Sequence, residues 1–111
     1  TIPTHLGQLE SLLKLRLSNN RLTGTIPRQF NELQTLRVLN LDDNRLSGTL
    51  PDFLDEIDVL YNQLVPPHLY ELSAAGNELT GTLPLMWQFL PSLSVVDLSR
   101  NPHNVSFEGF L

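Results

Sequence analysis

The hydrophobic positions of this chain recur in blocks that lie 24 residues apart. Residues 12–27 read LLKLRLSNNRLTGTIP, and residues 36–51 repeat the pattern as LRVLNLDDNRLSGTLP. Two further copies are centred on Asn77 and Asn101, and an Ile-Pro pair at residues 2–3 lies 24 residues before the pair at 26–27. A repeat of this length is typical of a solenoid, in which each repeat forms one coil and neighbouring coils share a core.

Within each block, apolar and polar residues alternate over a short stretch. Leu15-Arg16-Leu17 and Leu39-Asn40-Leu41 are the clearest examples. A period of two indicates a strand with one buried and one exposed face. The pattern therefore predicts one short strand per coil, and we expect these strands to stack in parallel.

An asparagine follows each predicted strand, three residues after its second apolar position. The four are Asn20, Asn44, Asn77 and Asn101. A side-chain amide offers two donors and an acceptor to backbone groups left unpaired where a strand turns away. We expect the four asparagines to form a buried, hydrogen-bonded structural ladder.

The second half of the block predicts how the coil closes. Gly24, Gly48 and Gly81 allow backbone conformations closed to residues with a Cβ, and the following apolar-Pro pair turns the chain toward the far side. Three residues after each proline comes a large apolar residue, as at Phe30 and Trp87. This position predicts a core role, and for Trp87 the alternative is an exposed anchor for a partner.

The spacing of the asparagines predicts one insertion. Asn44 and Asn77 are 33 residues apart, nine more than the period, and the excess falls at about residues 58–67, a segment that contains Tyr61. After Asn101 the Gly and Pro positions of the block are missing. We predict a single domain over residues 1–111 with about four coils, and we expect it to be part of a longer array.

Composition excludes several classes of function. The 111 residues include 25 Leu and no Cys, and the formal net charge is -5. Nucleic acid and anionic membranes attract basic surfaces, so neither is expected as a partner. No apolar run is long enough to insert in a membrane, and disulfides and thiolate metal sites are excluded.

The exposed face of the predicted sheet is the candidate binding surface. Side chains between the buried leucines should point to solvent in columns that run across the sheet, with about 4.8 Å between neighbouring strands. The columns comprise Lys14, Val38, Glu71 and Val95; Arg16, Asn40, Ser73 and Asp97; and Ser18, Asp42, Ala75 and Ser99. Their polar members are the predicted ligand contacts, and the alternative for any one of them is a solvated strand residue.

No catalytic residue, metal site or cofactor is predicted. Asp42 and Asp43 are adjacent, so on a strand they would point to opposite sides and could not flank one bond. The carboxylates within residues 52–58 lack the glycine and the ordered alternation of a calcium loop, which favours a solvated acidic turn. The histidines, His5, His68 and His103, are scattered over different coils. An enzyme would require a grouping of carboxylates or histidines that the linear sequence conceals.

The pattern LxxLxLxxNxLxGxIPxxLxxL, read over residues 9–33, resembles the plant-specific class of leucine-rich repeats. The resemblance implies a curved right-handed solenoid, with a short-stranded parallel β-sheet on the concave face and loops and 3-10 turns on the convex face. In this class it also implies short extra strands away from the main sheet. Family members occur in receptor-like kinase and receptor-like protein ectodomains and in polygalacturonase-inhibiting proteins. They bind peptides, hormones, other proteins or glycans, and commonly carry Cys-paired caps, which this chain lacks.

We therefore predict a non-catalytic module that binds a protein, peptide or glycan in an extracellular or cell-surface signalling protein. The triplet Asn104-Val105-Ser106 is an N-glycosylation acceptor, in agreement with that location. Two alternatives remain open. The coils could only space or cap a longer ectodomain, or they could form a secreted inhibitor of wall-degrading enzymes.

Overall fold

The computed structural model of the chain describes residues 1–50, 68–81 and 92–102. The predicted insertion at about 58–67, with Tyr61, lies outside these residues. So do Trp87, His103 and the glycosylation acceptor Asn104.

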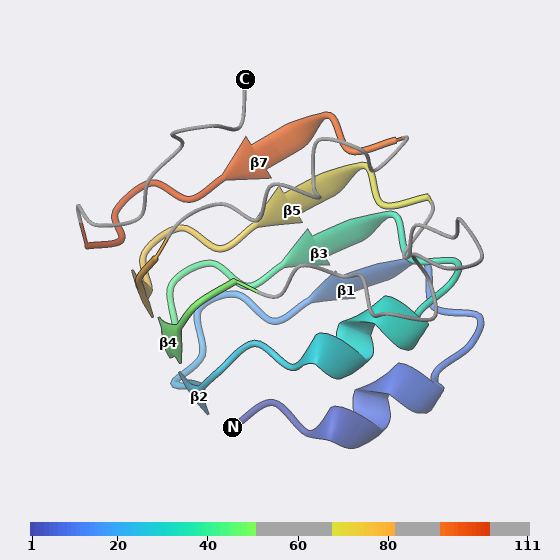
Figure 1. The fold of residues 1–111 in the computed structure, drawn as a ribbon, viewed down its shortest axis with the longest axis horizontal. Coiled ribbons are helices and arrows are strands. Elements are labelled where there is room, and N and C mark those ends of the chain that lie inside the picture. The colour runs from blue at the N-terminus through green and yellow to red at the C-terminus, as the bar shows by residue number, and fades with distance from the viewer. Residues whose placement is uncertain (51–67, 82–91, 103–111) are drawn as a thin grey trace.

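The main sheet contains one short strand from each predicted coil. Its strands are β1 (Lys14–Arg16), β3 (Val38–Asn40), β5 (Glu71–Ser73) and β7 (Val95–Asp97), all parallel and in this order (Figure 1). Leu15, Leu39 and Leu72 are aligned across β1, β3 and β5. The predicted parallel sheet is confirmed, and the longer spacing between β3 and β5 does not shift the register.

A second, smaller sheet lies where each coil turns away from the main one. It consists of β2 (Thr23–Gly24), β4 (Arg45–Gly48) and β6 (Glu78–Leu79), again parallel; β2 and β4 are at the left of Figure 1. Each strand begins within three residues of a repeat asparagine. These are the short extra strands that the family resemblance implies.

Two 3-10 helices form the opposite side of the solenoid, one before the first predicted coil and one within it. They are η1 (Thr4–Gln8) and η2 (Arg28–Glu32), which lie side by side below the main sheet in Figure 1. Each begins directly after a proline, at Pro3 with φ -69° and at Pro27 with φ -68°. Proline fits these positions because its ring fixes φ near -65° and it has no N–H to satisfy.

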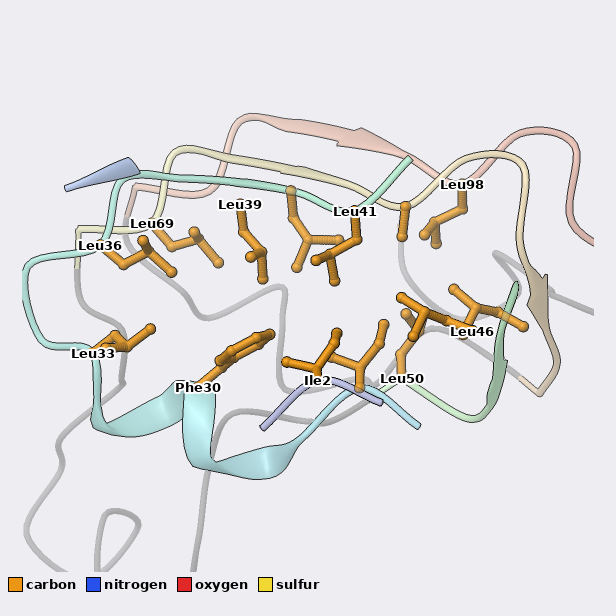
Figure 2. Close-up of a cluster of buried hydrophobic side chains, with 14 residues drawn as sticks. Ile2, Phe30, Leu33, Leu36, Leu39, Leu41, Leu46, Leu50, Leu69 and Leu98 are labelled. Atoms are coloured by element: carbon orange, nitrogen blue, oxygen red, sulfur yellow. The ribbon is translucent and has the colours of Figure 1, made fainter. Parts of the chain in front are cut away.

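The core lies between the main sheet and the 3-10 helices. Figure 2 shows Leu39 and Leu41 pointing down from the β3 segment and Phe30 pointing up from η2, and all three are fully buried. The core role predicted for Phe30 is confirmed. In the first coil, Leu15 and Leu17 pack against the same cluster but are only partly buried, since β1 is an edge strand of the sheet.

The glycine positions carry the backbone conformation that the pattern predicts. Gly24, Gly48 and Gly81 have φ of +85°, +79° and +91°. At Gly48 a Cβ would also lie 3.0 Å from the methyl group of Thr25 in the preceding coil. Glycine is therefore needed both for its backbone angle and for close coil stacking.

Candidate functional site

The structure places the predicted contact residues in register on the exposed face of the main sheet. Lys14, Val38, Glu71 and Val95 are aligned across the four strands, and so are Arg16, Asn40, Ser73 and Asp97. The third column continues beyond the strands, where Asn19 N donates to Asp42 O and Asp43 N to Ala75 O. With strands about 4.8 Å apart, each column spans about 14 Å.

The columns differ in how accessible their members are. Lys14, Arg16, Asp97 and Ser99 are exposed, whereas Ser18, Asn40, Asp42 and Glu71 are half-buried. Two column members depart from the expectation that they point to solvent, since Ala75 is only 1% exposed and Ser73 only 7%. The small Ser73 side chain is held against a neighbour, because Ser73 Oγ donates to Asp42 Oδ1 at 2.6 Å.

The Asp42 carboxylate joins two coils. Its Oδ1 accepts the Ser73 hydroxyl and also the Ala75 N–H at 2.8 Å. The Asp42 N–H in turn donates to Asn40 Oδ1 at 3.0 Å. These contacts hold the Asp42 carboxylate in one orientation between the second and third predicted coils.

Asp97 is oriented by its own turn. Its Oδ1 accepts the Ser99 hydroxyl at 2.7 Å and the Ser99 N–H at 3.0 Å. The Ser99 hydroxyl, and then its backbone N–H, hold the pKa of Asp97 below its usual value because both stabilise the charged form. Asp97 is therefore an exposed carboxylate at neutral pH.

The repeat asparagines tie each coil to the one before it. Asn44 Nδ2 donates to Leu17 O at 2.9 Å and to Leu41 O at 3.1 Å, while its Oδ1 accepts the Leu22 N–H. Asn77 and Asn101 repeat this arrangement one and two coils later. Asn44 and Asn77 are buried, and Asn101 is half-buried.

Asn20 departs from the expected burial. Its side chain is exposed, and its Nδ2 donates to Leu17 O and Ser18 O, both within its own coil. The reason is its place next to the edge strand β1, which pairs with no strand on its outer side among the described residues.

Asp43 and Arg100 form an ion pair that passes over one coil. Arg100 Nη1 lies 2.8 Å from Asp43 Oδ1, and Gly76 lies between them. A Cβ at Gly76 would collide with the Asp43 carboxylate and lie 3.1 Å from Arg100 Nη1. The adjacent carboxylates Asp42 and Asp43 thus contact different partners.

The structure also groups exposed side chains that the repeat pattern did not single out. Leu13, Arg37, Tyr70 and Ser94 are all exposed and form a row at the start of the four strands, beside Lys14, Val38, Glu71 and Val95. We call these eight residues the strand-start rim. A signal was present in the sequence, since Leu13 and Tyr70 are large apolar residues at variable positions of the repeat.

Other candidate sites lie apart from the concave face. His5 and His68 are exposed, and within the described ranges no three His, Asp or Glu side chains come together to hold a metal ion. An open groove of about 660 Å³ lies along the second-sheet side, with Thr1, Thr25, Thr49 and Arg28 among its lining residues. None of its lining residues belongs to the predicted columns. No helix among the described residues is long and apolar enough to cross a membrane.

Comparison with known proteins identifies the family. A family model described as leucine rich repeat matches residues 3–64, more than half of the chain. No curated protein gives a significant match.

Three solved structures are similar over most of this chain. The PEPR1–AtPEP1 crystal structure matches with a TM-score of 0.77 and 35% sequence identity, over 90% of this chain and 13% of that one. The plant peptide hormone receptor RGFR1 in complex with RGF2 matches with a TM-score of 0.77 and 36% identity, over 90% and 15%. The BIR2 ectodomain from Arabidopsis thaliana matches with a TM-score of 0.75 and 33% identity, over 90% and 48%.

The chain spans less than half the length of each of these three proteins. The repeat pattern, the two parallel sheets and the 3-10 helices agree with the family match and with these structures. The chain therefore belongs to the leucine-rich-repeat family, in the plant class whose solved members include receptor ectodomains.

Proposed function

We propose that this chain is a non-catalytic recognition module that binds a peptide or protein segment across the concave face of its main sheet. The observation that carries the proposal is the register of β1, β3, β5 and β7, which aligns Arg16, Asn40, Ser73 and Asp97 in one column. Rigid columns of polar side chains on a repeat scaffold form the extended concave surfaces that solenoid proteins use for binding. The peptide hormone receptor with bound RGF2 supports a ligand of this kind.

The charge distribution of the concave face supports a ligand with both signs of charge. Lys14 and Arg16 lie on β1, whereas Glu71 and Asp97 lie on β5 and β7. An ordinary peptide carries both signs, so it can complement both ends of the surface. Such complementarity contributes more to specificity and to the rate of association than to affinity alone.

The same family class supports an extracellular or cell-surface location, since one of the similar structures is an ectodomain. Glycosylation of Asn104 and a role in signalling belong to this proposal. The non-catalytic assignment is supported by the Asp42 and Asp97 carboxylates, which are held by separate hydrogen-bond networks.

The test uses peptides selected from a displayed random library on the immobilised full-length protein. Calorimetry then compares wild type with a variant carrying Arg16→Ala, Asn40→Ala and Asp97→Ala. We expect binding to weaken at least about tenfold, because side chains at the centre of an interface contribute most of its binding energy. The matched control carries Arg28→Ala, Glu32→Ala and Gln34→Ala, three exposed positions on and beside η2, and should bind like wild type.

Two results would contradict the proposal. Equal binding by the triple variant and wild type would show that the ligand does not contact the concave columns. The absence of any selected peptide would favour the alternative in which these coils only space a longer ectodomain.

A further inference from the structure

The strand-start rim contains most of the exposed large apolar side chains of the described residues. The described residues include four such side chains, Leu9, Leu13, Tyr70 and Val95, with 46%, 48%, 52% and 38% of their surface exposed. Leu13, Tyr70 and Val95 lie at the start of β1, β5 and β7. A single exposed Leu is ordinary, but apolar side chains that gather at one edge of a sheet mark an interaction surface.

Backbone hydrogen bonds make this row continuous. Arg37 N donates to Leu13 O at 2.7 Å, and Tyr70 N donates to Arg37 O at 2.8 Å. Ser94 N completes the row by donating to Tyr70 O at 2.9 Å. Arg37 is thus one strand spacing, about 4.8 Å, from Leu13 on one side and from Tyr70 on the other.

The rim combines the residue types that dominate binding energy with the positive charges of Lys14 and Arg37. Tyr and Arg are enriched among residues whose truncation weakens protein interfaces most. In residues 1–50, 68–81 and 92–102 the only ion pair is that of Arg100 with Asp43, so Lys14 and Arg37 have no carboxylate partner there. Glu71 lies on the β5 side of the rim, where its carboxylate would repel a carboxylate of the ligand.

We propose that the strand-start rim anchors the ligand through an acidic residue that lies next to an apolar one. The apolar side chain packs on Tyr70, Val38 and Val95, and the carboxylate pairs with Arg37 and Lys14. An extended segment advances about 3.3 Å per residue, so one strand spacing places the two anchors one or two residues apart. This inference rests on the proposed function, because it names the chemistry of the peptide or protein segment and the edge of the sheet that receives it.

The test measures both the sequence of selected ligands and the effect of rim substitutions. Peptides selected from a random displayed library on the full-length protein should carry Asp or Glu within two residues of an aromatic or aliphatic residue. A synthetic copy of the strongest one should bind Tyr70→Ala and Arg37→Glu at least about tenfold more weakly than wild type. Tyr70→Phe, which keeps the ring, should bind within about twofold of wild type.

A charge exchange makes the test specific. Replacing the acidic residue of the peptide by Lys should weaken binding to wild type and restore binding to Arg37→Glu, because the two charges again oppose each other. The matched control is Arg21→Glu, an exposed arginine that follows the strand instead of preceding it, and it should leave affinity unchanged. Tyr70 and Arg37 are exposed, and circular dichroism should show that the variants fold like wild type.

The possible failures can be told apart. Loss of binding in the concave-column variant together with wild-type binding by Tyr70→Ala and Arg37→Glu would overturn the rim proposal and leave the proposed function intact. Failure to select any peptide would overturn both. A wild-type dimer in analytical ultracentrifugation that becomes a monomer on Tyr70→Ala would show that the rim binds a second copy of the chain, which also overturns the proposal.

Discussion

Asn77 illustrates how one side chain can hold two coils together. Its amide donates to Leu41 O in the preceding coil and to Ala74 O in its own, and its Oδ1 accepts the Leu46 N–H, all in buried surroundings. Removing it would leave the Leu46 N–H without this acceptor where water is excluded, and Leu41 O and Ala74 O would each lose one of two side-chain amide donors. A buried polar group without a partner costs more than the hydrogen bond itself contributes.

Asn77→Ala should therefore lower the free energy of unfolding by about 2–4 kcal/mol in urea titrations, since an unsatisfied buried group costs about 1–3 kcal/mol. Asn20→Ala is the matched control. Asn20 is exposed and bonds only within its own coil, so its loss should cost less than about 1 kcal/mol. Equal losses in the two variants would contradict the role of the ladder between coils.

Asp97 gives a prediction for pH dependence. Its pKa is lowered in the folded protein, so the hydrogen bonds from Ser99 contribute stability that is present above the unfolded pKa and is lost as pH falls through the folded pKa. Ser99→Ala removes the hydroxyl donor and should raise the pKa of Asp97 toward its usual value, as read from the carboxyl carbon shift in an NMR titration. Ser94→Ala, whose hydroxyl donates to Ser92 O, should leave that pKa unchanged.

At the scale of elements, the strands depend on how completely each coil is covered. Leu39 on β3 is fully buried between neighbouring coils, whereas its equivalent Leu15 on the edge strand β1 is only partly buried. The two side chains occupy the same position of the repeat, so any difference in their contribution comes from the coils beside them.

Leu39→Ala should destabilise the protein by about 2–5 kcal/mol, because it removes buried apolar surface and leaves a cavity in a packed core. Leu15→Ala should cost distinctly less in the same denaturant titration. If the two substitutions had equal effects, the core would not be shared between coils in the way that Figure 2 shows.

The strands of the main sheet could be predicted from the sequence, because period-two alternation and the 24-residue repeat act on every coil alike. The positions of the glycines and the core role of Phe30 followed for the same reason. The register of the strand-start rim also follows from the repeat, but its exposure does not, because the pattern of buried leucines says nothing of how the variable residues Leu13, Arg37 and Tyr70 lie. The burial of Ser73 likewise depends on the Asp42 carboxylate of the neighbouring coil.

At the scale of the whole molecule, one ion pair among the described residues joins two coils that are not nearest neighbours. The Asp43–Arg100 pair connects the second and fourth predicted coils across Gly76. The Arg100 and Asp43 side chains are 63% and 39% exposed, so water and salt screen the pair and it contributes little to stability. The sequence alone could not reveal it, because residues 57 positions apart become partners only where the coil between them has no side chain.

The direction of the asparagine bonds has a consequence for how the protein forms during synthesis. Each bonding partner found for Asn44, Asn77 and Asn101 precedes that asparagine in the sequence. As the nascent chain leaves the ribosome, every new asparagine thus emerges after all the groups it binds. Each coil can close on a template already outside the exit tunnel, so this solenoid can fold in the order of its translation.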